Sequence, residues 1–90
     1  MEWPRPIEQV KPQYTSDAMR AKLQGMVALE ALVLADGSVG EVKVVRSLDP
    51  LFGLDRAAVA AVKQWKFTPG TQSGRAIPVL VMIELTFTLR

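Results

Sequence analysis

Polar and apolar residues alternate along the last part of the chain, whereas apolar residues recur at helical spacing in its middle. Every second position from residue 77 to residue 89 is apolar, which is typical of a β-strand with one buried face. Between Leu54 and Trp65 the apolar residues recur three or four positions apart, with charged residues opposite, which predicts an amphipathic helix. Pro69 and Gly70 then stop this regular structure.

The start of the chain predicts one short extended piece and one short helix. Residues 7–11 are expected to be extended, because Pro12 restricts the residue before it. Residues 17–23 predict a helix of about two turns, which Thr15 or Ser16 can cap. Residues 1–6 have the character of a proline-rich spacer tail or an artificial chain end, and the folded domain is expected to span residues 7–90.

A β-hairpin is predicted next. Residues 26–35 are apolar on both faces, and a second strand over residues 39–47 follows an Asp36-Gly37 turn, in which glycine accepts a positive φ at little cost. The first strand suits a central position because both its faces are apolar. The second strand carries charged side chains and suits an edge.

The helix over residues 54–65 provides the crossover to the last strand. A right-handed crossover places that last strand, residues 77–89, on the free side of strand 26–35. The predicted fold is therefore α+β, with two helices packed on one face of a three-stranded antiparallel sheet. Counting strands in chain order, the predicted order is second, first, third, and the outer edge of the last strand is left unpaired.

Alternation assigns the two faces of this sheet. One face carries the residues expected to form the core under the helices: Val27, Leu29, Ala31, Val33, Ile77, Val79, Val81, Ile83, Leu85, Phe87 and Leu89. The opposite face gathers Leu32, Leu34, Leu80 and Met82 around Glu30 and Glu84. Such an apolar patch marks a partner surface, unless it is incidental or covered by the N-terminal segment.

Composition removes several classes of function. The 90-residue chain has no cysteine and no histidine, so zinc sites and the common nucleophile–base pairs are excluded, and neither a catalytic residue, a metal site nor a cofactor is predicted. The net charge of +2 comes from basic residues spread along the chain among acidic ones, which does not favour nucleic-acid binding. No apolar run approaches the roughly 18 residues of a membrane span, and no leader pattern is present.

Several motifs together resemble the C-terminal domain of TonB, the bacterial energy transducer, over residues 7–90. The most specific is the W-x-F-x-P-G ending of the predicted second helix. The matching blocks are Trp65, Phe67, Pro69 and Gly70; Lys11 to Tyr14 as K-P-Q-Y; Gly25 to Leu29 as G-x-V-x-L; Asp36-Gly37; and Gly74 before the last strand. One departure is Thr15, where family members usually carry proline after the tyrosine.

The resemblance implies a periplasmic domain that is anchored to the inner membrane in the full-length protein and is not an enzyme. It implies that the last strand accepts the extended N-terminal peptide of an outer-membrane transporter as an added strand, while the missing N-terminal part contacts an inner-membrane motor complex. The partner-binding residues implied are Gln13, Tyr14, Val79, Leu80, Val81, Met82, Ile83, Glu84 and Leu85.

Two alternatives remain open. The same unpaired edge could join two copies of the chain into a homodimer, or the last strand could be exchanged between them. The domain could instead be a regulatory sensing module appended to a membrane receptor, which the residues that precede it in a full-length protein would reveal.

Overall fold

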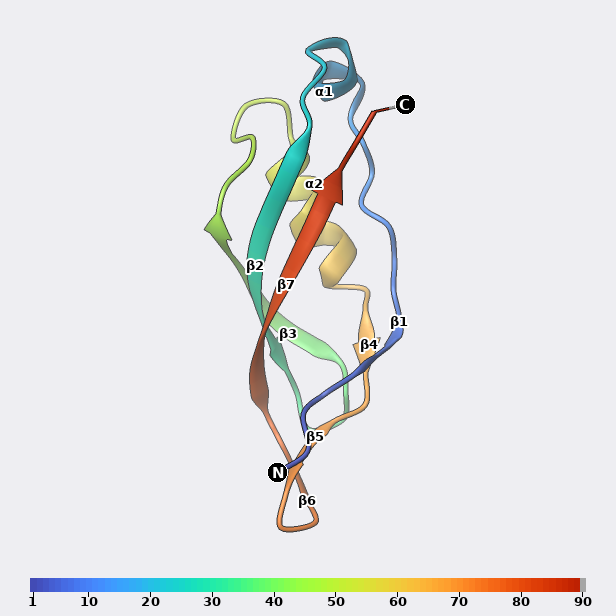
Figure 1. Cartoon of the computed structure of the whole chain (residues 1–90). Helices are drawn as coiled ribbons and strands as arrows, with labels where there is room; N and C mark the ends of the chain where they lie inside the picture. Colours follow the sequence, from blue (N-terminus) through green and yellow to red (C-terminus); the bar gives the residue numbers. More distant parts are fainter. Residues whose placement is uncertain (90) are drawn as a thin grey trace.

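The computed structural model describes residues 1–89 as an elongated α+β domain with extents of 49 × 21 × 16 Å (Figure 1). The helices are α1 (Ser16–Arg20) and α2 (Leu54–Val62). The strands are β1 (Pro6–Glu8), β2 (Gly25–Val33), β3 (Val39–Arg46), β4 (Lys66–Phe67), β5 (Gly70–Gln72), β6 (Arg75–Ile77) and β7 (Val79–Phe87). Within these described residues, no helix is long and apolar enough to cross a membrane.

The central sheet has the order β3-β2-β7, which confirms the predicted three-stranded arrangement. The strands β2 and β7 pair antiparallel over nine residues each, from Gly25 opposite Phe87 to Val33 opposite Val79, without an irregularity. The strand β3 pairs antiparallel with the other side of β2 and shifts register at two places. The predicted hairpin strands are confirmed to within two residues at their ends.

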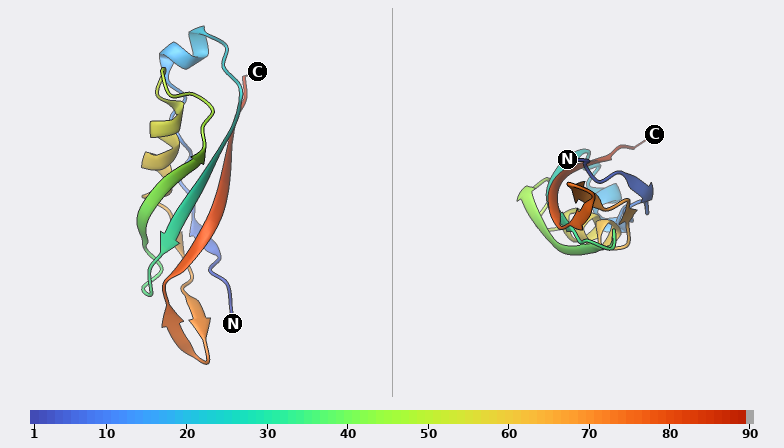
Figure 2. Two further views of the ribbon diagram at one scale, coloured as in Figure 1. Left: turned by 90° about the vertical axis from the view of Figure 1, so that its left-hand side faces the viewer. Right: turned by 90° about the horizontal axis from the view of Figure 1, so that it is seen from below.

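Both helices lie on the same side of this sheet, with α2 along it and α1 at one end (Figure 2). The helix α2 buries its apolar face against the sheet, as predicted from apolar residues that recur three or four positions apart. The Thr15 side chain caps α1 by accepting a hydrogen bond from the backbone N–H of Ala18 at 3.2 Å, so the cap that the sequence predicted is present. The helix itself is shorter than predicted and ends at Arg20.

The core lies between α2 and one face of the sheet, on the side that alternation assigned to it. Its fully buried members include Val27, Leu29, Leu54 and Val62, and β7 contributes Ile83, Leu85 and Phe87. The opposite face of the sheet, which is turned toward the viewer in Figure 1, has no helix over it. We call this second face the open face.

The last strand is not continuous, and in this detail the prediction of one strand over residues 77–89 was wrong. Ile77 belongs to β6, the chain breaks pairing at Pro78, and β7 ends at Phe87. Proline has no N–H to donate to a ladder, which explains why the break falls there. The residues before it form a hairpin, β5-β6, whose turn at Ser73 and Gly74 has positive φ values of 52° and 76°.

A second small ribbon joins the start of the chain to the segment after α2. The strand β1 pairs antiparallel with β4, and the backbones of Glu2 and Thr71 form a further isolated bridge. The prediction that residues 7–11 are extended is thus met at its beginning, where Ile7 and Glu8 lie in β1. The N-terminal segment therefore follows the length of the molecule beside α2 and β4 (Figure 1).

The loop between β3 and α2 is held by two carboxylates. Asp49, which is 3% exposed, accepts backbone N–H bonds from Leu51, Phe52 and Leu54 at 3.0, 2.9 and 3.2 Å. Asp55 accepts from the backbone N–H groups of Leu48 and Asp49, both at 3.0 Å. Burial alone would raise the pKa of Asp49, but these N–H donors and the positive charge of Arg56 together lower it below the ordinary value of 3.8.

We expect Asp49→Ala to lower the free energy of unfolding by about 2–4 kcal/mol, because it leaves several N–H groups of this loop without an acceptor. Urea unfolding at pH 7 measures the change. The control is Asp17→Ala, which removes an exposed carboxylate that forms only a surface ion pair with Arg20 at 3.4 Å. The expected cost of the control is under about 1 kcal/mol.

The stabilisation by Asp49 has a definite pH dependence. Because the pKa of its folded-state carboxyl is lowered, the stabilisation is complete above the ordinary value of 3.8 and is lost as the pH falls through the lower folded-state value. The difference between wild type and Asp49→Ala should therefore shrink in acid. An equal difference at pH 7 and pH 2.5 would contradict this role.

Gly37 and Gly74 provide a matched pair for testing the turn after β2. Both have positive φ, 88° and 76°, but a Cβ on Gly37 would lie 2.1 Å from the backbone oxygen of Phe67, whereas a Cβ on Gly74 meets nothing within 4 Å. We expect Gly74→Ala to cost about 1 kcal/mol and Gly37→Ala at least about 2 kcal/mol more, because backbone must move. Thermal unfolding measures both, and equal costs would contradict the close approach.

Candidate functional site

The free edge of β7 is the feature of the fold best suited to binding a partner. The strand β7 pairs with β2 on one side only, and no backbone hydrogen bond within residues 1–89 reaches its other side. Figure 1 shows β2 along one side of β7 and no strand along the other. Because neighbouring N–H groups of a strand point alternately to its two sides, this edge presents a row of unpaired donors and acceptors.

The other edge of the sheet, on β3, is less suited to adding a strand. The pairing of β3 with β2 is irregular between Ala28 and Leu29 and again between Ala31 and Val33. Bulges twist a strand edge away from a flat template, and β3 also carries Glu41 and Lys43 as exposed side chains. The continuous ladder of β7 offers a straighter row of backbone groups.

The N-terminal segment does not cover the edge of β7. Its strand β1 pairs with β4 instead, and the backbone N–H of Thr68 donates to the Arg5 carbonyl at 2.8 Å. Farther along, the indole Nε1 of Trp65 donates to the carbonyl of Val10 at 2.9 Å. Trp65 of the W-x-F-x-P-G motif thus holds the segment beside the end of α2. This bond could not be predicted from the sequence.

Tyr14 and Gln13, the two candidate residues outside β7, lie in different surroundings. The Tyr14 hydroxyl donates to the Leu23 carbonyl, and its ring meets the edge of the Phe87 ring at a centroid distance of 5.5 Å. Tyr14 therefore packs at the end of β7. The exposed Gln13 points instead to the α2 side, where it lines a pocket, so the structure does not place its side chain among the β7 residues.

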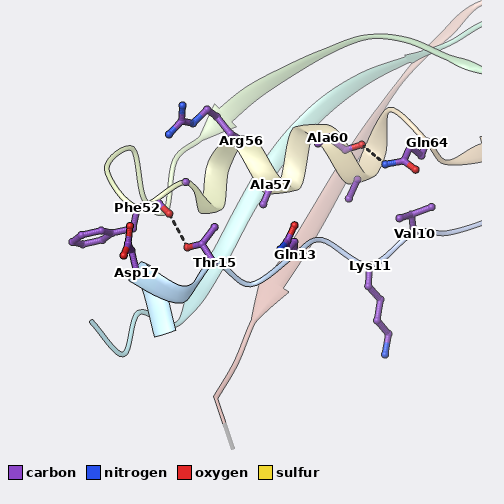
Figure 3. A pocket seen from close by; sticks show the side chains of 12 residues that line it. Val10, Lys11, Gln13, Thr15, Asp17, Phe52, Arg56, Ala57, Ala60 and Gln64 are labelled. Atoms are coloured by element: carbon purple, nitrogen blue, oxygen red, sulfur yellow. Dashed lines mark hydrogen bonds between the residues drawn. The ribbon is translucent and has the colours of Figure 1, made fainter. Parts of the chain in front are cut away.

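This pocket, of about 560 Å³, lies between the N-terminal segment and α2 (Figure 3). Its lining combines Ala57 and Ala60 of α2, and Gln64 just after this helix, with Gln13 and Lys11 from the segment. This pocket could not be predicted from the sequence, because its two walls, within residues 10–17 and 52–64, are at least 35 positions apart in the chain. The small side chains on the outer side of α2 were the only sequence signal for this space.

Side chains of β7 alternate between the core and the open face. Val79, Ile83 and Leu85 are buried and Val81 is half-buried, so the predicted core set within β7 is confirmed. Leu80, Met82 and Glu84 are exposed on the open face. A strand added to the edge of β7 would therefore contact backbone on one side and this exposed row on its open face.

The described part of the chain shows no arrangement for metal binding, since residues 1–89 contain no group of three or more carboxylates close enough to hold an ion. Asp36, in the turn after β2, accepts hydrogen bonds from the backbone N–H and the hydroxyl of Ser38, which lower its pKa. The acidic residues of the loops thus have structural partners.

A family model of the Gram-negative bacterial TonB protein C-terminal matches residues 10–89. The chain belongs to this family. The match covers α1, α2, the whole three-stranded sheet and Tyr14, and it begins after the ribbon strand β1. The resemblance inferred from the motifs is confirmed.

Several curated relatives of the TonB C-terminal family agree. The chain is 40% identical over 78 residues to Protein tonB2 of Pseudomonas aeruginosa, covering 87% of this chain and 28% of that protein. It is 38% identical over 78 residues to Protein TonB of Xanthomonas campestris, covering 87% of this chain and 34% of that protein. Against Protein TonB of Escherichia coli, identity is 28% over 85 residues, covering 94% and 35%. The chain thus spans about a third of these relatives.

A solved structure shares the fold. The solution NMR structure of the Pseudomonas aeruginosa TonB CTD superimposes with a TM-score of 0.75, covering 96% of this chain and 86% of that one. Sequence identity between the two is 22%. The TonB C-terminal fold is therefore shared at low identity.

The free edge of β7 makes a prediction about amide hydrogen exchange. Alternate N–H groups of β7 bond to β2 and should exchange slowly, whereas those between them point to the free edge and should exchange fast. We expect this alternation over residues 80–86 in exchange measured by NMR. In β2, which is paired on both sides, slow exchange should be continuous, and uniform protection of β7 would show that its edge is covered.

Proposed function

We propose that this domain is the C-terminal part of a TonB-like energy transducer and that the free edge of β7 takes up an extended peptide from an outer-membrane transporter. The observation that carries the proposal is the unpaired row of backbone groups along β7. Family membership over residues 10–89 supports the transducer role. In this role the domain transmits force or a conformational signal and performs no catalysis.

The backbone from Val79 to Leu85 would supply the ladder for the added strand. A peptide bound in this way is held mainly through its main chain, so partners with different sequences can be accepted. Tyr14 would border the peptide at the far end of the strand, where it packs on Phe87. Gln13 would contact a peptide that extends past this end toward α2, on whose side it lines the pocket.

Binding of this kind should be weak. A seven-residue segment offers about five added hydrogen bonds, each with a net value of ~1 kcal/mol. A total of about 5 kcal/mol corresponds to a dissociation constant on the order of 0.1–1 mM, before the cost of ordering the peptide and any gain from its side chains. Such a weak affinity suits a transducer that must release its transporter after each cycle.

In its cellular setting, the domain would lie in the periplasm, and the longer protein would be anchored in the inner membrane. The curated relatives are about three times as long as this chain, which leaves room in them for an anchor and a spacer. Contact with an inner-membrane motor complex would belong to that other part. Residues 1–6 would then be the end of the spacer, bound to the domain through the bridge between Glu2 and Thr71.

The same free edge also allows two copies of the chain to pair through β7. Such a homodimer would use the same backbone groups as the peptide, so the two kinds of binding would compete. The mass of the domain in solution, measured over a range of concentrations, separates them. A dimer that persists on dilution and takes up no peptide would support the pairing of copies instead.

The test is a titration of the isotope-labelled domain with nine-residue peptides from the N-terminal segments of outer-membrane transporters. We expect amide shifts confined to β7 and the region of Tyr14, together with slowed exchange of the outward-pointing amides of β7. Shifts that are absent at several millimolar peptide would overturn the proposal.

Proline variants give the matched control. Val81→Pro and Met82→Pro remove adjacent N–H groups, of which one points to the free edge and one to β2. The variant that loses the N–H at the free edge keeps its pairing with β2, and it should bind peptide at least about tenfold more weakly than wild type. Val45→Pro, on the exposed part of the opposite edge strand, should leave peptide binding unchanged.

A further inference from the structure

The open face of β7 carries two large apolar side chains beside its free edge. Leu80 is 56% exposed and Met82 is 62% exposed, although both lie in a regularly paired strand. Leu80 also lines, with Leu32 of β2, a hollow of about 250 Å³ on the open face, whose other lining residues are Glu30, Glu41 and Lys43. The apolar side chains beside the free edge therefore have charged side chains as their neighbours farther across the sheet.

Glu84 continues the same row and has no cationic partner. Within residues 1–89, the only ion pair at 4.0 Å or less joins Arg20 and Asp17. In the sheet, Glu84 lies opposite Ala28, and Arg46 lies on the far side of that alanine. Two strand spacings, about 10 Å, separate the chain positions of Glu84 and Arg46, so the nearest position for a cation is on the free side.

A strand added beside β7 would bring its own side chains against this row. Directly opposite residues of neighbouring strands have their Cβ atoms about 4.5–5.5 Å apart, and alternate residues share a face. Three successive open-face residues of the peptide would therefore lie beside Leu80, Met82 and Glu84. Apolar pairs and opposite charges at such positions stabilise a sheet, and like charges destabilise it.

Building on the proposed function, we propose that the β7 edge selects extended peptides with two apolar residues and one lysine or arginine at alternate positions of one face. The apolar residues would lie beside Leu80 and Met82, and the cation beside Glu84. The peptide can run parallel or antiparallel to β7. In both cases the order apolar, apolar, cation is counted from the peptide residue that lies beside Leu80. The backbone ladder supplies general binding, and this row supplies a preference among partners.

The experiment uses a nine-residue peptide of alternating valine and threonine with blocked ends. A single lysine replaces each position in turn, and a second series carries glutamate at the same positions. Binding is measured by NMR titration against wild type, Glu84→Lys and the control Glu41→Lys, which makes the same charge change on the opposite edge strand. Both variants alter exposed side chains.

For wild type, we expect a preference at one or two positions of the peptide, both even or both odd. At these positions the lysine peptide should bind about two- to fivefold more tightly than the glutamate peptide. This ratio should reverse in Glu84→Lys, persist in Glu41→Lys and shrink in 1 M salt. A third series replaces each valine by serine. In the double variant Leu80→Thr/Met82→Thr, the advantage of valine over serine at the positions beside residues 80 and 82 should disappear.

Equal affinities of the lysine and glutamate series, with peptides still bound along β7, would overturn the charge preference and leave the proposed function intact. An equal change in Glu41→Lys would also overturn it, because the effect would then come from net charge. If no peptide of either series binds, the proposed function fails and this preference fails with it.

Discussion

The antiparallel ladder between β2 and β7 joins nine residues of each strand without a bulge and places their alternate side chains in the core. This regularity leaves a straight row of backbone groups along the free edge of β7. In a sheet of three strands only the middle strand is paired along both of its edges. The outer edge of β7 must therefore either be covered by another part of the chain or remain open. The helices cannot cover it, because both lie against one face.

The bonds of the N-terminal segment explain why the edge stays open. This segment meets the end of β7 where Tyr14 packs on Phe87, and farther back it is bound by β4 and the Trp65 indole. Trp65 therefore has two roles, since its ring packs in the core and its Nε1 fixes Val10. A chain without these bonds could turn its own leading residues into the missing fourth strand and would exclude a partner.

The sheet order, the faces of its strands and the two helices could be predicted from the sequence, because each has its own period of hydrophobic residues. Tyr14 was predicted as a partner-binding residue, and its contact with Phe87 could not be predicted, because it joins residues distant in the chain. The ribbon of β1 and β4 was missed for the same reason, since β4 has only two residues and its partner β1 lies about sixty residues earlier. The break at Pro78 was foreseeable, since proline rarely continues a paired strand.

The free edge could be predicted from the sequence, because the predicted strand order leaves the outer side of the last strand unpaired. The side chains beside this edge depend on the register of the strands, which the sequence does not specify. That register places Glu84 opposite Ala28, and within residues 1–89 this carboxylate forms no ion pair. The pocket beside α2 likewise depends on how closely the N-terminal segment approaches the helix.

The antiparallel ribbon between the first residues and residues 66–71 gives the domain a mechanical direction. Tension on Met1 along the long axis of the molecule would load the contacts at Glu2, Arg5 and Pro6 in shear, so that they resist together. Tension across that axis would reach Glu2 first and open the contacts one after another. The same few hydrogen bonds would thus yield at a lower force to a sideways pull than to a lengthwise one.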